Sequence, residues 1–169
     1  MLQPDIYWLR ELEGVRLALM PRPRSGEWLA DEIAGWNRLG VQTVVSLLES
    51  DEVREFDLAD EQSLCQGANL QFVSFPIPDR GVPSNSADFA NLVAALEQRL
   101  RSGKSVAVHC RAGIGRSGLL GACVLSGFGI DPDSAFGMLS RARGVSVPDT
   151  DAQVKWVREF ARVRSRIAT

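Results

Sequence analysis

A cysteine and an arginine separated by five residues stand out in residues 108–118, which read VHCRAGIGRSG. The two glycines permit the positive φ angles of a tight loop whose backbone N–H groups point inward and bind an anion. At the start of a helix such a loop binds phosphate, and an arginine fork can hold two phosphate oxygens at once. The predicted phosphate-binding residues are Arg111, Ala112, Gly113, Ile114, Gly115 and Arg116.

The same positive field would stabilise a thiolate at Cys110, so we expect the pKa of this thiol to lie well below its ordinary value. Ser117 could donate a hydrogen bond to the sulfur and assist its later departure. An isolated cysteine is most often a small buried hydrophobic residue. Here the spacing of the glycines, Arg116 and Ser117 favours a nucleophile in a phosphate site, and therefore phosphoryl transfer to sulfur.

A leaving oxygen also needs a proton, and Asp79 is the candidate donor. It lies in residues 75–83, FPIPDRGVP, on a loop punctuated by proline and glycine after an expected strand. The alternative is that aspartate is present only because it favours a turn. Other carboxylates stand in more helical surroundings, namely Asp57, Asp60 and Asp88.

The elements that must position these residues alternate along the chain. Apolar and β-branched runs predict strands at 15–19, 41–48, 70–75 and 106–108. Apolar periodicity and capping residues predict helices at 25–38, 50–67, 89–100, 116–128, 132–143 and from 151 onward. This order is typical of an α/β fold with a mainly parallel central sheet flanked by helices. Cys110 would follow a central strand, at the edge where such sheets bind ligands.

Composition sets the class of protein. The 169 residues are 45% hydrophobic and 24% charged, with a formal net charge of −2, which predicts one domain over residues 1–169 and no general affinity for nucleic acid or membrane. No apolar run is long enough for a transmembrane helix, and the N-terminus does not resemble a signal peptide. Three scattered cysteines predict neither a disulfide framework nor a zinc site, so we expect a reducing, cytoplasmic setting.

The run HCRAGIGRS at residues 109–117 resembles the HCxxGxxR[ST] signature of the cysteine-dependent protein tyrosine phosphatases. Element order and size are similar to the small dual-specificity phosphatases over nearly the whole chain. The resemblance implies that Cys110 is the nucleophile, Arg116 binds phosphate and Asp79 is the general acid, with His109 ordering the loop. Tyrosine-specific members have tryptophan where Ile77 stands, which favours the dual-specificity type.

The implied reaction is a double displacement through a cysteinyl-phosphate, with no metal or organic cofactor. Phosphotyrosine in proteins or peptides is the expected substrate, with phosphoserine and phosphothreonine as further candidates, and phosphate-like oxyanions should inhibit. A phosphoinositide or small phosphate ester is the alternative, although lipid-active members tend to carry lysines where Ala112 and Ile114 stand. A non-catalytic phosphate-binding module would require loss of the cysteine, arginine or acid. Oligomeric state has no sequence signal.

Three weaker signals each have a structural and a functional interpretation. Gln153 could position water, but it also completes a capping box with Thr150, which we favour. Cys123 could form a protective disulfide with Cys110, yet a free buried cysteine is favoured. The basic series in the last helix could attract an acidic partner, but we favour a solvated helix face; it comprises Lys155, Arg158, Arg162, Arg164 and Arg166.

Overall fold

The computed structural model describes residues 2–168, within which five strands form one sheet in the order β1-β2-β5-β3-β4. The bounds are Tyr7–Trp8 (β1), Leu17–Met20 (β2), Thr43–Ser46 (β3), Gln71–Ser74 (β4) and Val106–His109 (β5). Strands β2 to β5 pair in parallel, and β1 joins the edge antiparallel to β2. The expected mainly parallel sheet is therefore confirmed, with β5 at its centre.

The register brings the ends of the parallel strands together. His109 at the end of β5 pairs with Met20 of β2 on one side and with Ser46 of β3 on the other. All four residues of β5 are buried, as a central parallel strand requires. Cys110, the next residue, consequently emerges at the carboxyl edge of the sheet, beside the segments that follow β2 and β3.

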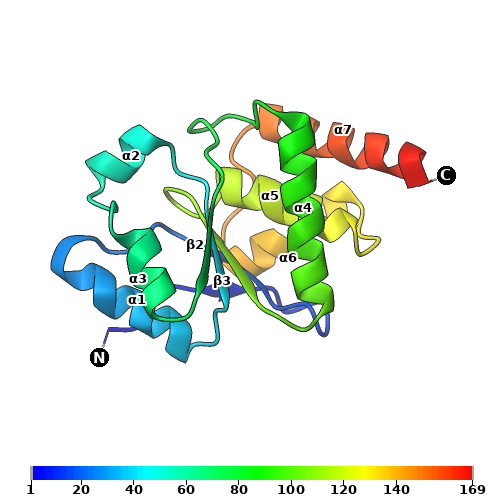
Figure 1. The fold of residues 1–169 in the computed structure, drawn as a ribbon. Coiled ribbons are helices and arrows are strands. Elements are labelled where there is room, and N and C mark those ends of the chain that lie inside the picture. The colour runs from blue at the N-terminus through cyan, green and yellow to red at the C-terminus, as the bar shows by residue number, and fades with distance from the viewer. Residues whose placement is uncertain (1, 169) are drawn as a thin grey trace.

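Helices cover both faces of the sheet. In Figure 1, α1, α2 and α3 lie on one side of the strands and α4 to α7 on the other. The bounds are Leu29–Arg38 (α1), Ser50–Glu55 (α2), Glu61–Gly67 (α3), Ser86–Arg101 (α4), Gly115–Ser126 (α5), Pro132–Arg143 (α6) and Asp151–Ala168 (α7). Helix α5 is buried from Arg116 to Leu125, because it packs between the sheet and the other helices on its side.

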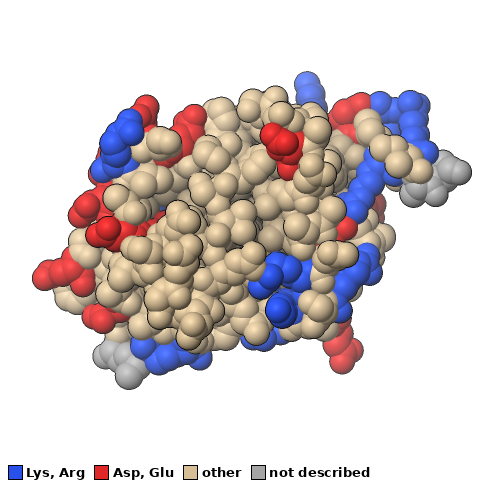
Figure 2. Space-filling view, viewed as in Figure 1, with Lys and Arg blue, Asp and Glu red and all other residues tan. Residues whose placement is uncertain are grey.

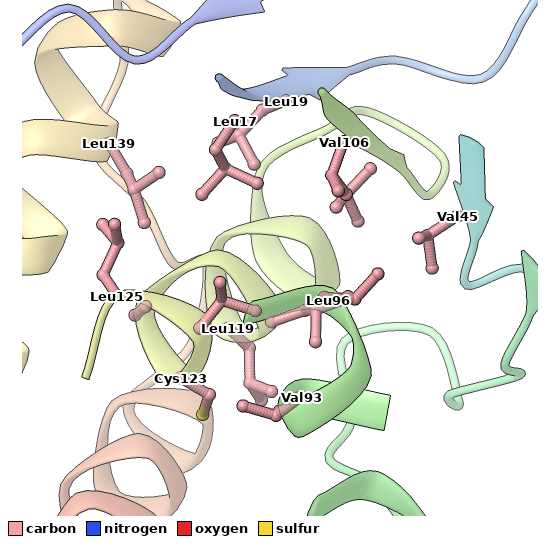
Figure 3. Packing of buried hydrophobic residues seen from close by; sticks show 14 of the residues in the cluster. Leu17, Leu19, Val45, Val93, Leu96, Val106, Leu119, Cys123, Leu125 and Leu139 are labelled. Carbon is pink, nitrogen blue, oxygen red and sulfur yellow. The ribbon is translucent and has the colours of Figure 1, made fainter. Parts of the chain in front are cut away.

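Two apolar clusters hold these layers together. In the larger, Leu17 and Val106 point from the sheet toward the helical layer, where Leu119 of α5 and Leu96 of α4 meet them (Figure 3). The second cluster fills the opposite face, where Trp36 of α1 is buried. Full burial of such side chains contributes about 1.5–3 kcal/mol each. This packing fixes the direction in which α5 leaves the loop after Cys110.

The helix expected over residues 50–67 is wrong, because the chain forms two helices there. α2 ends at Glu55 and α3 begins at Glu61, and Asp57 between them has a left-handed φ of 53°. Aspartate is one of the few residues other than glycine that adopts this conformation readily. The break turns α2 toward the carboxyl edge of the sheet, where an acidic residue of this helix, Glu52, binds Arg116.

Side-chain capping accounts for some of the other boundaries but not for all of them. The helix expected from residue 25 begins only at Leu29, because Ser25 makes no side-chain cap and a 3₁₀ turn, Gly26–Trp28, precedes α1. Asp131 caps α6 by accepting from the Ser134 amide at 3.0 Å, and Gly144 ends it with a φ of 84°.

Among the described residues, no helix is both long and apolar enough to cross a membrane.

Charge is unevenly distributed over the face in Figure 2, with acidic side chains mainly on the side of α1–α3 and basic ones mainly on the side of α4 and α7. Several arginines of α7 are already paired with carboxylates. Arg158 lies 2.9 Å from Asp133, and Arg164 forms a bidentate pair with the buried Glu97. These pairs agree with the structural interpretation of the basic series.

Candidate active site

Cys110, Arg116 and Asp79 line one cavity of about 200 Å³ at the carboxyl edge of the sheet. It is bounded by the loop after β4, the loop between β5 and α5, and the segment before α7. The remaining lining residues are Arg80, Arg111, Ala112, Ile114, Gly115 and Asp149. A groove of about 790 Å³ between the α5–α6 connection and α7 is larger, but neither cysteine nor histidine lines it.

Carbonyl groups of the loop after Cys110 point outward. The Arg111 carbonyl accepts from the Arg22 amide at 3.1 Å, and the Ala112 carbonyl accepts from Arg143 Nη2 at 3.0 Å. A trans peptide places its N–H opposite its C=O. The amides of Ala112 and Gly113 therefore point into the loop, as an anion site requires.

The two glycines of the loop have different roles. Gly113 has a φ of 71°, and a Cβ atom there would lie 2.3 Å from the Met20 carbonyl oxygen. Gly115 is the first residue of α5 and has no positive φ, so the expectation of a left-handed conformation is wrong for it. A Cβ atom at Gly115 would lie 3.0 Å from Asp149 Cβ and from Gln153 Oε1, so glycine permits close packing there.

Cys110 is 3% exposed and is surrounded by groups that favour its thiolate. Burial opposes ionisation, but the Ser117 hydroxyl and amide, the Arg116 charge and the Gly113 amide outweigh it and lower the pKa of the thiol. The buried Ser117 Oγ has no hydrogen-bond partner of standard geometry among the described residues, so its hydroxyl proton is available for a hydrogen bond to the Cys110 sulfur.

Arg116 is 1% exposed and is fixed by partners from several segments. Its Nη1 and Nη2 donate to the two carboxylate oxygens of Glu52 at 2.7 and 2.8 Å. Nη1 also donates to the Ile77 carbonyl at 2.9 Å, and Nη2 donates to Asp79 Oδ1 at 3.2 Å. All of these bonds come from Nη1 and Nη2, so the side of the fork that carries Nε is the side that can meet a phosphate.

Glu52 is a site residue that the sequence analysis missed. It lies in α2 and is buried beside Arg116, with Arg111 Nε 3.8 Å from its Oε1. Burial opposes ionisation, but bonds from Arg116 and the Glu49 amide outweigh it and hold the pKa of Glu52 below its ordinary value. Nothing local in the sequence distinguishes Glu52 from other acids in the first turn of a helix.

Asp79 is the only one of the four candidate acids that lines the cavity within the described chain. Its carboxylate contacts Arg116 and lies 4.0 Å from Arg111 Nη1, and its side chain is 44% exposed. A carboxyl group that is partly open to solvent and faces the cysteine loop can exchange protons with a bound ligand. Asp57, Asp60 and Asp88 lie outside the cavity lining.

His109 is fully buried and does not line the cavity. Its Nε2 lies 2.6 Å from Glu61 Oε1, and its Nδ1 lies 3.3 Å from the Cys110 carbonyl. Burial disfavours the imidazolium, but Glu61 and the carbonyl outweigh it and raise the pKa of His109. The pair ties α3 to the start of the cysteine loop, which agrees with an ordering role.

Arg143 is a second residue that the sequence analysis missed. Besides holding the Ala112 carbonyl, its guanidinium lies over the Tyr7 ring at 4.2 Å. It is the last residue of α6, where a cation also suits the helix dipole. Arg143 and Ala112 are 31 residues apart in the sequence, so no local sequence pattern predicts this contact.

The other cysteines differ from Cys110 in their surroundings. Cys65 and Cys123 are fully buried, and burial raises the pKa of Cys65 to about 12 and that of Cys123 well above its ordinary value. Both are free thiols. Cys123 is therefore packed as the structural interpretation expected.

Gln153 forms the capping box with Thr150. The backbone N–H of Gln153 donates to Thr150 Oγ1 at 3.1 Å, and the side-chain Oε1 of Gln153 accepts from the backbone N–H of Thr150 at 3.2 Å. Gln153 is fully buried, and its Nε2 donates to the Gly81 carbonyl at 3.1 Å. With both ends of its side-chain amide engaged, it has a structural role rather than the positioning of water.

Comparison with known proteins agrees with this arrangement. Residues 7–167 match the family described as "PTP-SAK: Swiss Army Knife protein, DSP-PTPase phosphatase domain". "Cyclin-dependent kinase inhibitor 3" of Rattus norvegicus is 28% identical over 123 residues, covering 72% of this chain and 58% of its own. "Putative tyrosine phosphatase 197R" of Invertebrate iridescent virus 6 is 31% identical over 150 residues, covering 81% and 53%. The chain thus spans somewhat more than half the length of these curated relatives.

Solved structures share the fold. Kinase associated phosphatase, with its catalytic cysteine replaced by serine, superimposes with a TM-score of 0.86 at 23% identity, covering 100% of this chain and 98% of that one. Tk-PTP in the active form gives a TM-score of 0.75 at 25% identity, covering 95% and 99%. PTPMT1 in complex with PI(5)P gives 0.74 at 20% identity, covering 96% and 99%.

Proposed function

The chain belongs to the DSP-PTPase phosphatase domain family, and from this premise we propose that it hydrolyses phosphate monoesters of proteins through a cysteinyl-phosphate. The convergence of Cys110, Arg116 and Asp79 on one cavity is the observation that supports this proposal most strongly. The cysteine is poised as a thiolate, the arginine is fixed by Glu52, and the carboxylate faces both.

Substrate binding would use the inward amides of the loop and the Nε and Nη2 edge of Arg116. A phosphate would accept from Arg116 Nε and Nη2 and displace Asp79 from the Nη2 contact. These donors would hold the three equatorial oxygens, on which charge is spread in the transition state. Asp79 would then be free to turn toward the leaving oxygen.

The chemistry would proceed in two displacements. The Cys110 thiolate forms a bond to phosphorus while the bond to the ester oxygen breaks, and Asp79 gives its proton to that oxygen. Water then attacks the cysteinyl-phosphate, Asp79 takes a proton from the water, and the sulfur leaves as a thiolate. The Ser117 hydroxyl would stabilise the departing sulfur.

Replacing the proposed general acid should slow poor substrates selectively. Asp79→Asn should lower kcat for phenyl phosphate by about 10² or more, because the amide cannot protonate the leaving phenolate. Asp149→Asn, at the same cavity, is the matched control and should cost much less. Steady-state hydrolysis of phenyl phosphate measures this, and full activity of Asp79→Asn would remove Asp79 from the mechanism.

Loss of the carboxylate behind Arg116 should also impair the reaction. Glu52→Gln should lower kcat/KM for aryl phosphates by about 10- to 100-fold, because the neutral amide cannot hold both guanidinium nitrogens and the fork shifts. Glu55→Gln is the matched control, since Glu55 lies on the same helix, is 63% exposed and is 3.7 Å from Arg111. Equal kinetics for the two variants would show that Glu52 does not position Arg116.

Substrate class can be tested with a panel of hydrolysis rates measured with chelator and reductant present. We propose phosphotyrosyl peptides as the preferred substrates, with phosphothreonyl peptides hydrolysed more slowly. The likeness to "Putative tyrosine phosphatase 197R" supports this choice. Ala112 and Ile114 at the cavity also offer no lysine for the further phosphates of a polyphosphorylated inositol lipid. Activity on a soluble phosphoinositide alone would overturn the protein substrate, and phosphate binding without any turnover would overturn the enzyme.

The redox setting follows from the same chemistry. We propose that the protein acts in a reducing, cytoplasmic compartment, because a low-pKa thiolate is readily oxidised. The three free cysteines support this proposal.

A further inference from the structure

The loop that carries Asp79 is attached to the fold on both sides of that residue. On the upstream side, the Ile77 amide donates to the Leu47 carbonyl at 3.0 Å, and the Ile77 carbonyl accepts from Arg116. On the downstream side, the Gly81 carbonyl accepts from Gln153 Nε2 at 3.1 Å. Arg80 adds an ion pair with Asp149 at 2.6 Å. The position of Asp79 therefore depends on both attachments.

The downstream attachment holds a conformation that the loop would not favour by itself. Arg80 has a left-handed φ of 58°, which is unfavourable for a residue with a Cβ atom. The Gly81 amide donates to the Pro78 carbonyl at 2.8 Å and closes a turn that contains Asp79. Such backbone persists when surrounding contacts fix it. Gln153 and Asp149, which contact Gly81 and Arg80, are those contacts.

Gln153 is the more important of the two attachments. It is fully buried, whereas the side chains of Arg80 and Asp149 are 64% and 41% exposed, and an exposed ion pair contributes little in water. Its Oε1 accepts from the Asp149 and Thr150 amides at 3.1 and 3.2 Å. These two donors fix which end of the amide is oxygen, so Nε2 must face Gly81.

We propose that Gln153 is a positioning residue for the general acid. Its side-chain amide links the first turn of α7 to Gly81 and holds the Asp79 carboxyl group toward the cysteine loop. Gly115, the first residue of α5, packs against the same side chain, so Gln153 joins the acid loop, the phosphate loop and α7. This inference rests on the proposed function, because it assumes that Asp79 protonates the leaving group.

One substitution separates this role from helix capping. Gln153→Glu keeps an oxygen to accept from the Asp149 and Thr150 amides, but it removes the donor to Gly81 and places a carboxylate against that carbonyl. Thr150→Val is the matched control, because it removes the acceptor for the Gln153 amide and leaves the Gly81 contact in place. If Gln153→Glu does not fold, Gln153→Met takes its place in the test, because methionine is neutral, has a similar length and also lacks the donor to Gly81.

The test is the rate on two substrates that differ in leaving group. General acid catalysis matters for phenyl phosphate and hardly for 2,4-dinitrophenyl phosphate, whose leaving group departs without a proton. We expect Gln153→Glu to lower kcat/KM for phenyl phosphate about tenfold or more and to change kcat/KM for the dinitrophenyl ester by less than about twofold. The comparison uses kcat/KM because it reports the steps up to release of the phenol and excludes the later hydrolysis of the cysteinyl-phosphate, in which Asp79 acts as base. Thr150→Val should affect both substrates equally.

The other outcomes are decisive as well. Equal losses of kcat/KM on both substrates, or no loss on either, would overturn the positioning role of Gln153 while leaving the cysteine mechanism intact. Wild-type protein that hydrolyses neither ester would instead contradict the proposed function, and the inference would fall with it. Wild-type hydrolysis of the dinitrophenyl ester that Cys110→Ser abolishes therefore serves as the reference measurement.

Discussion

Cys110→Ser should have no measurable turnover of any phosphate ester, while it binds a phosphotyrosyl peptide at least as tightly as the wild-type protein. The loop that stabilises a thiolate cannot ionise an alcohol to the same extent, so the nucleophile is lost. Binding persists because its donors are the loop amides and Arg116, which the substitution leaves in place. A neutral hydroxyl also removes the repulsion between a thiolate and the phosphate dianion.

Calorimetric titration and steady-state kinetics on the same preparation would measure both effects. Cys65→Ala is the matched control, because Cys65 is a buried cysteine outside the cavity lining, and its turnover should remain at the wild-type level. Residual hydrolysis by a pure serine variant, above a few per cent of wild type, would contradict a cysteine nucleophile.

Arg116→Lys should lower kcat/KM by about 10²–10³-fold or more, even though the charge is kept. Lysine offers a point charge on a flexible chain, whereas the guanidinium binds Glu52 with two nitrogens and still presents an edge to phosphate. A lysine ammonium could reach Glu52 or the phosphate, but it could not hold both in fixed positions. The loss should therefore be in the transition state more than in substrate binding.

A stability measurement must accompany this result, since breaking a buried ion pair can cost about 3–5 kcal/mol of folding free energy. Thermal unfolding of Arg116→Lys should show a folded protein at the assay temperature. Arg162→Lys, an exposed arginine of α7, is the matched control and should behave as wild type. A folded Arg116→Lys variant with kcat/KM within tenfold of wild type would refute the assigned role.

Much of the fold could be predicted from local patterns. The apolar strand Val106–His109 and the proline and glycine at the ends of α6 are signals of this kind. The break at Asp57 could not be predicted, because its left-handed φ is a conformation that aspartate adopts only occasionally and the neighbouring residues give no turn signal. β1 escaped detection because two residues are too few to show alternation.

In the candidate site, too, local sequence predicts some of the residues and misses others. Cys110 and Arg116 share one short loop whose residue types specify an anion site, so their proximity was predictable. Asp79 was predictable as a loop residue, but its contact with Arg116 depends on how β4 and β5 flank β3. Glu52 and Arg143 come from α2 and α6, and no spacing rule connects either of them to the loop.

The central claim, that a phosphoryl group passes through Cys110, can be tested by trapping it. Asp79→Asn should react normally with 2,4-dinitrophenyl phosphate in the first step and slowly with water in the second, so the intermediate should accumulate. The experiment is a rapid quench in detergent, followed by the intact mass and by peptide mapping. We expect one phosphoryl group per chain, located on Cys110 and absent from the Asp79→Asn, Cys110→Ser double variant. Steady hydrolysis without any phosphorylated protein, or a phosphoryl group on another residue, would contradict the account.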